Sequence, residues 1–92
     1  MSLVKIRMDI ERALRDIMGL HGEAARRPLG ISGRLRELAR LGLTPPSTDR
    51  FLDAMRTMNE AVHGLDVKPE AAEQAIAVGT EFLSELRAIP RP

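Results

Sequence analysis

Residues 51–64 read Phe-Leu-Asp-Ala-Met-Arg-Thr-Met-Asn-Glu-Ala-Val-His-Gly, and their spacing decides the fold that we predict. Apolar side chains recur there at three- and four-residue intervals, the repeat of one face of an α-helix. These residues are Phe51, Met55, Met58, Val62 and Leu65. Arg56, Asn59 and His63 recur at i, i+3 and i+7, so they form a second row, called here the polar stripe, beside the apolar one. A cation, an amide and an imidazole are therefore expected at the edge of the core.

Three more helices are predicted around this stretch, and together the four account for most of the chain. Working outward, the expected ranges are 3–20, 32–41, 48–63 and 69–89, with a loop or frayed helix at 22–30. No segment alternates polar and apolar residues with period two, so no sheet is predicted. Helices joined by short connections pack most simply as an all-α, small antiparallel four-helix bundle.

The predicted helix ends rest on residues with known capping preferences. Ser32 is expected to be the N-cap of the second helix, and Ser47 or Thr48 that of the third. Gly42 and Gly64 are expected to stop the second and third helices, because glycine readily adopts the left-handed backbone conformation found there.

Composition narrows the class of protein. The 92 residues form one small domain, residues 1–92, with 43% hydrophobic residues but only two Phe and neither Trp nor Tyr. A net charge of +1 provides no strong field toward nucleic acid or an anionic membrane. The chain has no cysteine, which excludes disulfides and thiolate metal sites and fits a reducing compartment, so a cytoplasmic location is expected. No apolar run approaches the ~20 residues of a membrane span, so this segment is not expected to insert directly.

The two ends of the sequence suggest a domain taken from a longer protein. Residues 1–3 resemble an expression-vector remnant, and the chain stops at Pro90-Arg91-Pro92. We therefore expect neighbouring domains, and membrane segments are not excluded in the omitted part.

The run from Phe51 to Gly64 resembles the signature helix of HEPN-like domains, and is most similar to a short bacterial branch without an assigned function. Those domains share an Arg followed several residues later by a His, often with an Asn between them; here six residues separate Arg56 from His63, and Asn59 lies between them. A weaker similarity covers residues 10–17 and 35–42. The resemblance implies a helical bundle, usually a homodimer, in which the two signature helices face each other. In catalytic members the paired Arg and His residues cut RNA without a metal; other members bind nucleotides, and many are not catalytic.

The residue types suit that chemistry. His63 could move a proton near neutral pH, Arg56 could stabilise charge on a phosphate, and Asn59 could hold the imidazole or a sugar hydroxyl. No metal or other cofactor is expected, because two His and no Cys form no ligand cluster. Near-neutral charge and the lack of Trp and Tyr argue against a nuclease, and the two Phe are expected in the core.

Each of the three residues also has a structural interpretation. His63 precedes Gly64, where it can interact with the last carbonyls of its helix. Arg56 has carboxylates within one turn for surface ion pairs, and Asn59 can bridge to a loop. Two functions therefore stay open. The first is a non-catalytic dimerisation or interaction module of a larger bacterial protein; the alternative binds RNA or a nucleotide and cleaves RNA as a metal-independent endoribonuclease.

Other features carry weaker signals. The sequence Gly30-Ile-Ser-Gly-Arg34 opens a helix and could cradle an anion, although an ordinary capped helix start is the simpler interpretation. A group of five arginines could form a basic patch but is interpreted as a solvated helix face: Arg26, Arg27, Arg34, Arg36 and Arg40. Met8, Met18, Met55 and Met58 are interpreted as core residues.

Overall fold

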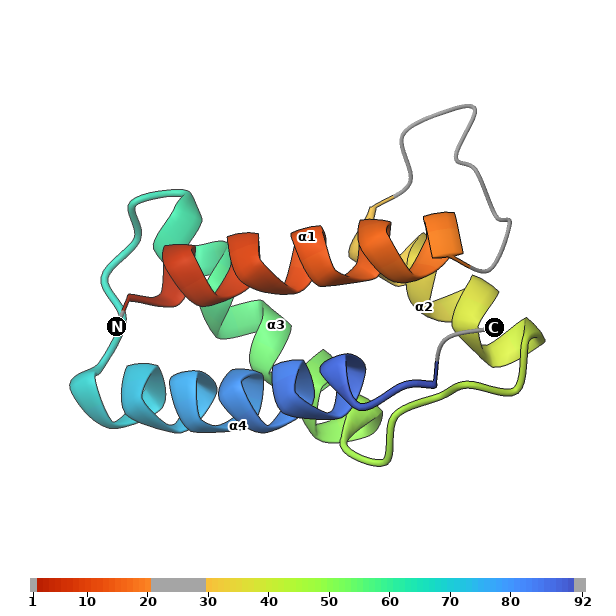
Figure 1. Cartoon of the computed structure of the whole chain (residues 1–92). Helices are drawn as coiled ribbons and strands as arrows, with labels where there is room; N and C mark the ends of the chain where they lie inside the picture. The colour runs from red at the N-terminus through yellow and green to blue at the C-terminus, as the bar shows by residue number, and fades with distance from the viewer. Residues whose placement is uncertain (1, 21–29, 91–92) are drawn as a thin grey trace.

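The computed structural model describes residues 2–20 and 30–90, and within them it contains four α-helices and no strand (Figure 1). The helices are α1 (Leu3–Leu20), α2 (Ile31–Arg40), α3 (Thr48–Val62) and α4 (Pro69–Arg87). The predicted all-α helical bundle is confirmed, and the observed helix bounds follow the predicted ones closely. The expected loop at 22–30 lies almost wholly outside the described residues. No described helix is both long enough and apolar enough to span a membrane.

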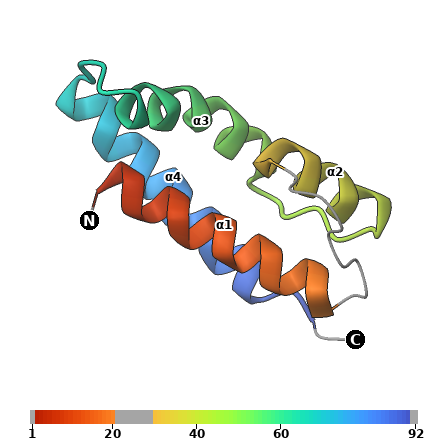
Figure 2. The ribbon, with the colours of Figure 1, turned by 90° about the horizontal axis from the view of Figure 1, so that it is seen from above.

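Helix α1 contacts all three other helices. It lies against α4, α3 and α2, and α4 also packs against α3. Helices α3 and α4 run in opposite directions, as their short connection requires, and α3 also runs against α1 (Figures 1 and 2). Helices α1 and α4, however, run in the same direction, so the bundle is not a simple up-down-up-down arrangement.

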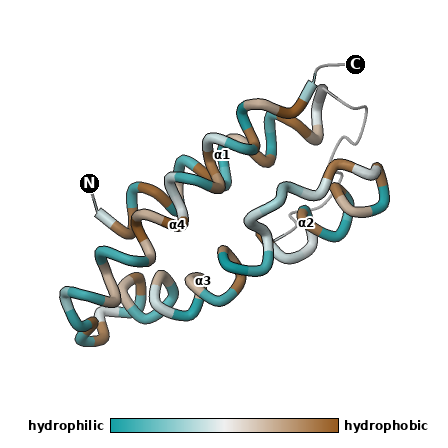
Figure 3. Tube along the Cα trace, turned by 90° about the horizontal axis from the view of Figure 1, so that it is seen from below, coloured by the Kyte–Doolittle hydropathy of each residue, from teal (hydrophilic) through white to brown (hydrophobic). Residues whose placement is uncertain are grey.

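The core is aliphatic with a single aromatic pair at its centre. Ile6, Ile10 and Leu14 of α1 are completely buried. The rings of Phe51 on α3 and Phe82 on α4 are also completely buried, with centroids 4.1 Å apart and planes inclined by 1°. Figure 3 shows polar and apolar residues alternating around each helix, as expected for helices with one buried face. The prediction that both phenylalanines belong to the core is confirmed.

Helix α4 approaches its neighbours closely where its side chains are smallest. A Cβ atom built on Gly79 would lie 2.9 Å from Met58 Cε and 3.1 Å from Ile6 Cγ1. Because real Cβ contacts are rarely this short, glycine permits α1, α3 and α4 to meet at this point.

The C-terminal signals in the sequence are confirmed. Gly42 and Gly64 both have φ of +74°, in the left-handed region that favours glycine. The amides that follow them close the ends of α2 and α3, since Leu43 N donates to Leu38 O at 2.8 Å and Leu65 N to Glu60 O at 2.9 Å. This six-to-one hydrogen bond is the Schellman motif.

The predicted N-caps are wrong in part. Helix α2 begins one residue earlier than expected, so Gly30 is its N-cap and Ser32 lies inside the first turn. Ser47 does occupy the N-cap position of α3, but its hydroxyl makes no capping hydrogen bond. The Oγ of Ser47 instead donates to Glu85 Oε1 at 2.6 Å, and its backbone N–H donates to the same oxygen at 2.8 Å. The hydroxyl of Ser47 thus makes a tertiary contact with α4 instead of capping α3.

Three apolar residues predicted to lie in the core are exposed, Val62 and Leu65 from their helical spacing and Met8 as a methionine. Met8 is 57% exposed, Val62 is 46% exposed and Leu65 is 60% exposed. The helical repeat identifies one face of α3, but at the end of that face no described residue buries Val62 or Leu65. The remaining predicted methionines of the core, Met18 and Met58, are buried, and Met55 is partly buried.

Candidate functional site

The polar stripe lies on the flank of α3 that faces α1, but its three members are not in equivalent environments. Arg56 and His63 are exposed, whereas Asn59, between them, is half-buried. Asn59 is the member of the stripe that contacts α1, through Arg7. The structure therefore brings the three side chains to one edge of the bundle without burying them together.

Asn59 is anchored by a residue that the sequence analysis did not consider. Its side-chain oxygen accepts a hydrogen bond from Arg7 Nη1 on α1. The same guanidinium donates through Nε to Glu11 Oε1 at 3.1 Å. The interpretation of Asn59 as a bridge to a loop backbone is therefore wrong, since its partner is a charged side chain of another helix. Arg7 directly follows the buried Ile6 in α1. This position at the edge of the core was the sequence signal that could have indicated a contact with another helix.

His63 ends α3, as its position before Gly64 suggested. It is the C-cap residue, and its backbone N–H donates to Asn59 O at 3.0 Å. Its imidazole is on the exposed surface, within the C-terminal turn, where the carbonyl groups of the helix favour a cation. His63 is thus free to contact a partner from solvent.

Arg56 makes no ion pair with any described residue, although Asp53 and Glu60 lie within one turn of it. The predicted surface ion pairs are therefore not formed. Arg7 of α1 adds a second guanidinium group, so this edge of the bundle carries Arg7 and Arg56 together with the imidazole of His63. Glu11 contributes a carboxylate to the same edge through its bond with Arg7.

Exposed apolar side chains gather beside the polar stripe. The start of α1 and the end of α3 lie at the same end of the molecule (Figures 1 and 2). Because the two helices run in opposite directions and meet at the Arg7–Asn59 contact, the turn of α1 around Arg7 lies near the residues that follow Asn59. Val4 and Met8 flank Arg7 on α1, and Val62 and Leu65 follow Asn59; these four exposed side chains are called here the end patch.

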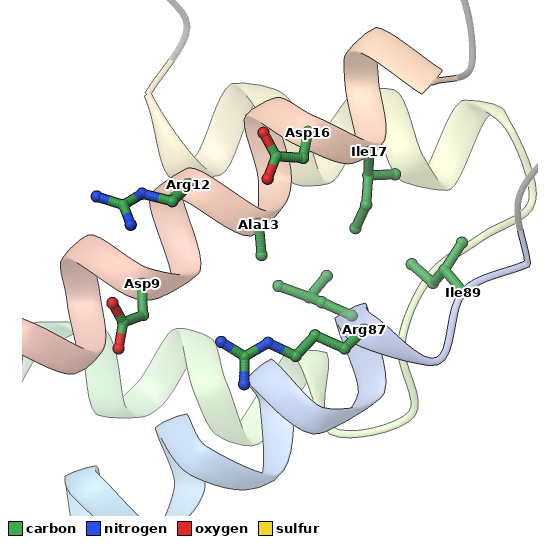
Figure 4. Close-up of a pocket in the computed structure, with 8 residues that line it drawn as sticks. Asp9, Arg12, Ala13, Asp16, Ile17, Arg87 and Ile89 are labelled. Atoms are coloured by element: carbon green, nitrogen blue, oxygen red, sulfur yellow. The ribbon is translucent and has the colours of Figure 1, made fainter.

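A groove of about 390 Å³ lies elsewhere, between α1 and the end of α4 (Figure 4). Its apolar floor includes Ala13, Ile17 and Ile89, and charged residues of both signs stand at its rim. Lys5 Nζ donates to the Asp9 carboxylate at 2.9 Å and holds the pKa of Asp9 below its ordinary value, with further lowering by nearby arginines. The balanced charge of the rim favours no single class of ligand.

Within residues 2–20 and 30–90, no group of three or more His, Cys, Asp or Glu side chains is placed to hold a metal ion. Comparison with known proteins gives no assignment: the chain matches no protein-family model, no curated protein and no solved structure.

Proposed function

We propose that this chain is a HEPN-like interaction module that pairs with a second copy of itself through the end patch and the adjoining polar stripe. The observation that carries the proposal is the end patch, where large apolar side chains of α1 and α3 remain in water at one end of the bundle. Full burial of one such side chain contributes about 1.5–3 kcal/mol. Covering several of them at once therefore favours association.

A second copy suits this surface for two physical reasons. The first is size: a domain of 92 residues has a limited core, and association buries additional apolar area. The second is symmetry, because in a two-fold dimer the end patch of each copy contacts the end patch of the other, so both patches are covered at once. The polar stripe then lies at the rim of the interface, where Arg56 and His63 stay in contact with water, in keeping with their exposure.

The proposal is tested by placing a charge in the end patch. We expect Met8→Glu combined with Val62→Glu to abolish a concentration-dependent dimer, because four buried carboxylates per dimer would face an apolar surface. Sedimentation velocity across a hundredfold range of protein concentration measures the effect. Ala77→Glu is the matched control, since Ala77 is an exposed residue of α4 remote from the patch. A wild-type chain that stays monomeric throughout this range would contradict the proposal.

A second candidate function is the binding of RNA or a nucleotide by the polar stripe, with metal-independent cleavage as its catalytic form. The exposure of Arg56 and His63 favours it, because neither side chain is used by the fold and Arg7 adds a second guanidinium. Guanidinium groups bind phosphate through paired hydrogen bonds, and an imidazole can transfer a proton.

Replacement of Arg56 or His63 by alanine separates this candidate from a purely structural role. If the stripe binds RNA, each change should weaken binding of a fluorescent single-stranded RNA at least tenfold in an anisotropy titration, with the melting temperature unchanged because both residues are exposed. Arg36→Ala, a change at an exposed arginine of α2, should leave binding intact. Equal binding by all four proteins, or no binding at low salt, would exclude this function.

A further inference from the structure

The first turn of α2 combines an uncapped helix start with a buried cation. Arg34 is only 9% exposed, and its Nε is the single fully buried side-chain nitrogen or oxygen among the described residues that has no hydrogen-bond partner. No ion pair of Arg34 occurs within the described part of the chain either. Buried cations are expensive unless an opposite charge or a hydrogen-bond acceptor accompanies them. An anion bound beside Arg34 would therefore offset the cost of burying its charge.

The nearest carboxylate on the same helix is already occupied. Glu37, one turn beyond Arg34, accepts from Arg40 Nη2 at 2.8 Å and from Arg40 Nε at 3.0 Å. Arg34 lies on the other side of Glu37, beside the buried residues Ile31 and Leu38. The anion that Arg34 lacks is thus not provided by its own helix.

The backbone around Arg34 offers further donors. The first intrahelical bond of α2 runs from Arg34 N to Gly30 O at 3.1 Å, so the N–H groups of Ile31, Ser32 and Gly33 precede the helical hydrogen-bond pattern. Gly30 has an extended backbone and no side chain to accept from them. The free N–H groups and the helix dipole both favour negative charge at this end.

The side chain and the helix start are directed at the same place. In an α-helix the Cα–Cβ bond leans toward the N-terminus, so a long side chain covers the turn that precedes its own residue. Arg34 stands four residues after Gly30 and three after Ile31, and its stem therefore runs back over the first turn. Gly30 and Ser32 are exposed, which leaves an approach from solvent.

We propose that the first turn of α2 and the guanidinium of Arg34 form a binding site for a tetrahedral oxyanion, either free phosphate or the phosphate group of a small monoester. Backbone N–H groups of residues 31–33 and the hydroxyl of Ser32 donate to its oxygens, and Arg34 supplies the positive charge. This site is separate from the polar stripe of α3, and it adds an anion-binding activity to the proposed dimerisation.

The test uses the full chain and two probes, inorganic phosphate and ribose 5-phosphate, each compared with sodium chloride at equal ionic strength. In wild type, either probe should raise the melting temperature and shift the backbone amide NMR signals of residues 31–34. Arg34→Met should melt higher than wild type without phosphate, because a buried unpaired charge is replaced by an apolar side chain of similar length. It should also lose the response to both probes.

Arg36→Met is the matched control, because Arg36 is an exposed arginine of the same helix, and it should keep the wild-type response. Arg34→Lys should bind at least fivefold more weakly than wild type, because lysine keeps the charge but not the planar fork. Tighter binding of ribose 5-phosphate than of phosphate would identify a monoester as the ligand, and the reverse order would identify the free ion. Absence of amide shifts in wild type, or an equal response in Arg34→Met, would overturn the proposal.

Discussion

Replacement of Phe82 by alanine is expected to lower the free energy of unfolding by about 3–5 kcal/mol, the largest effect of any single change that we predict. Phe82 is completely buried on α4, and its ring stacks on that of Phe51 with centroids 4.1 Å apart. The chain contains no other aromatic residue to fill the space. Alanine would therefore leave a cavity at the contact between α3 and α4 and expose one face of Phe51 to it.

Urea denaturation followed by circular dichroism at 222 nm measures this loss, because the chain has no Trp or Tyr for fluorescence. Phe82→Leu should cost less than the alanine variant, since leucine fills more of the cavity. Leu52→Ala, an exposed apolar deletion on α3, should change the free energy by less than about 0.5 kcal/mol. A cost for Phe82→Ala near that of Leu52→Ala would show that the aromatic pair is not the centre of the core.

Replacement of Glu85 by alanine is expected to cost about 3 kcal/mol. Glu85 Oε1 accepts both the Oγ–H and the backbone N–H of Ser47, a residue that is only 1% exposed. Hydrogen bonds to a charged group contribute about 1.5–3 kcal/mol each, and their loss leaves two donors at the start of α3 without their partner. The carboxylate also lies favourably against the positive end of the α3 dipole.

Glu81 provides the matched control, because it is one turn earlier on α4 and also accepts from a residue of α3. Glu81 pairs with Arg50 at 2.6 Å, and the side chain of Glu81 is 46% exposed while that of Arg50 is 62% exposed. Exposed ion pairs contribute about 0.2–1 kcal/mol, so Glu81→Ala should be nearly neutral in the same urea experiment. Similar losses for Glu81→Ala and Glu85→Ala would contradict the assignment of Glu85 as the residue that fixes the start of α3 to α4.

The polar stripe shows which features of a candidate site can be predicted from the sequence and which cannot. Its spacing places Arg56, Asn59 and His63 on one flank of α3, and the structure agrees. The partner of Asn59, however, is 52 positions away in the chain, and no local pattern indicates that Arg7 would reach it. Side-chain contacts between helices depend on their relative rotation and crossing angle, which helical periodicity does not contain.

Exposure was the second quantity that the sequence could not provide. Val62 and Leu65 recur at core spacing and Met8 was predicted to be in the core, yet each is exposed, because burial depends on which parts of a helix its neighbours cover. Arg34 shows the opposite case, since its charge predicts a solvated face but packing leaves it only 9% exposed. These are the residues on which the proposals of dimerisation and anion binding depend.

By itself, the sequence determined the helices, their C-terminal stops and the residues of the central core. These follow from local backbone preference, the left-handed glycines 42 and 64, and the 3.6-residue apolar repeat, all properties of short segments. Only the tertiary structure decided the hydrogen-bond partner of Ser47 at the start of α3, the anchoring of Asn59 by α1 and the surface left uncovered. Each of these features depends on how the helices pack against one another. The free energy of that packing comes from many contacts between residues far apart in the chain.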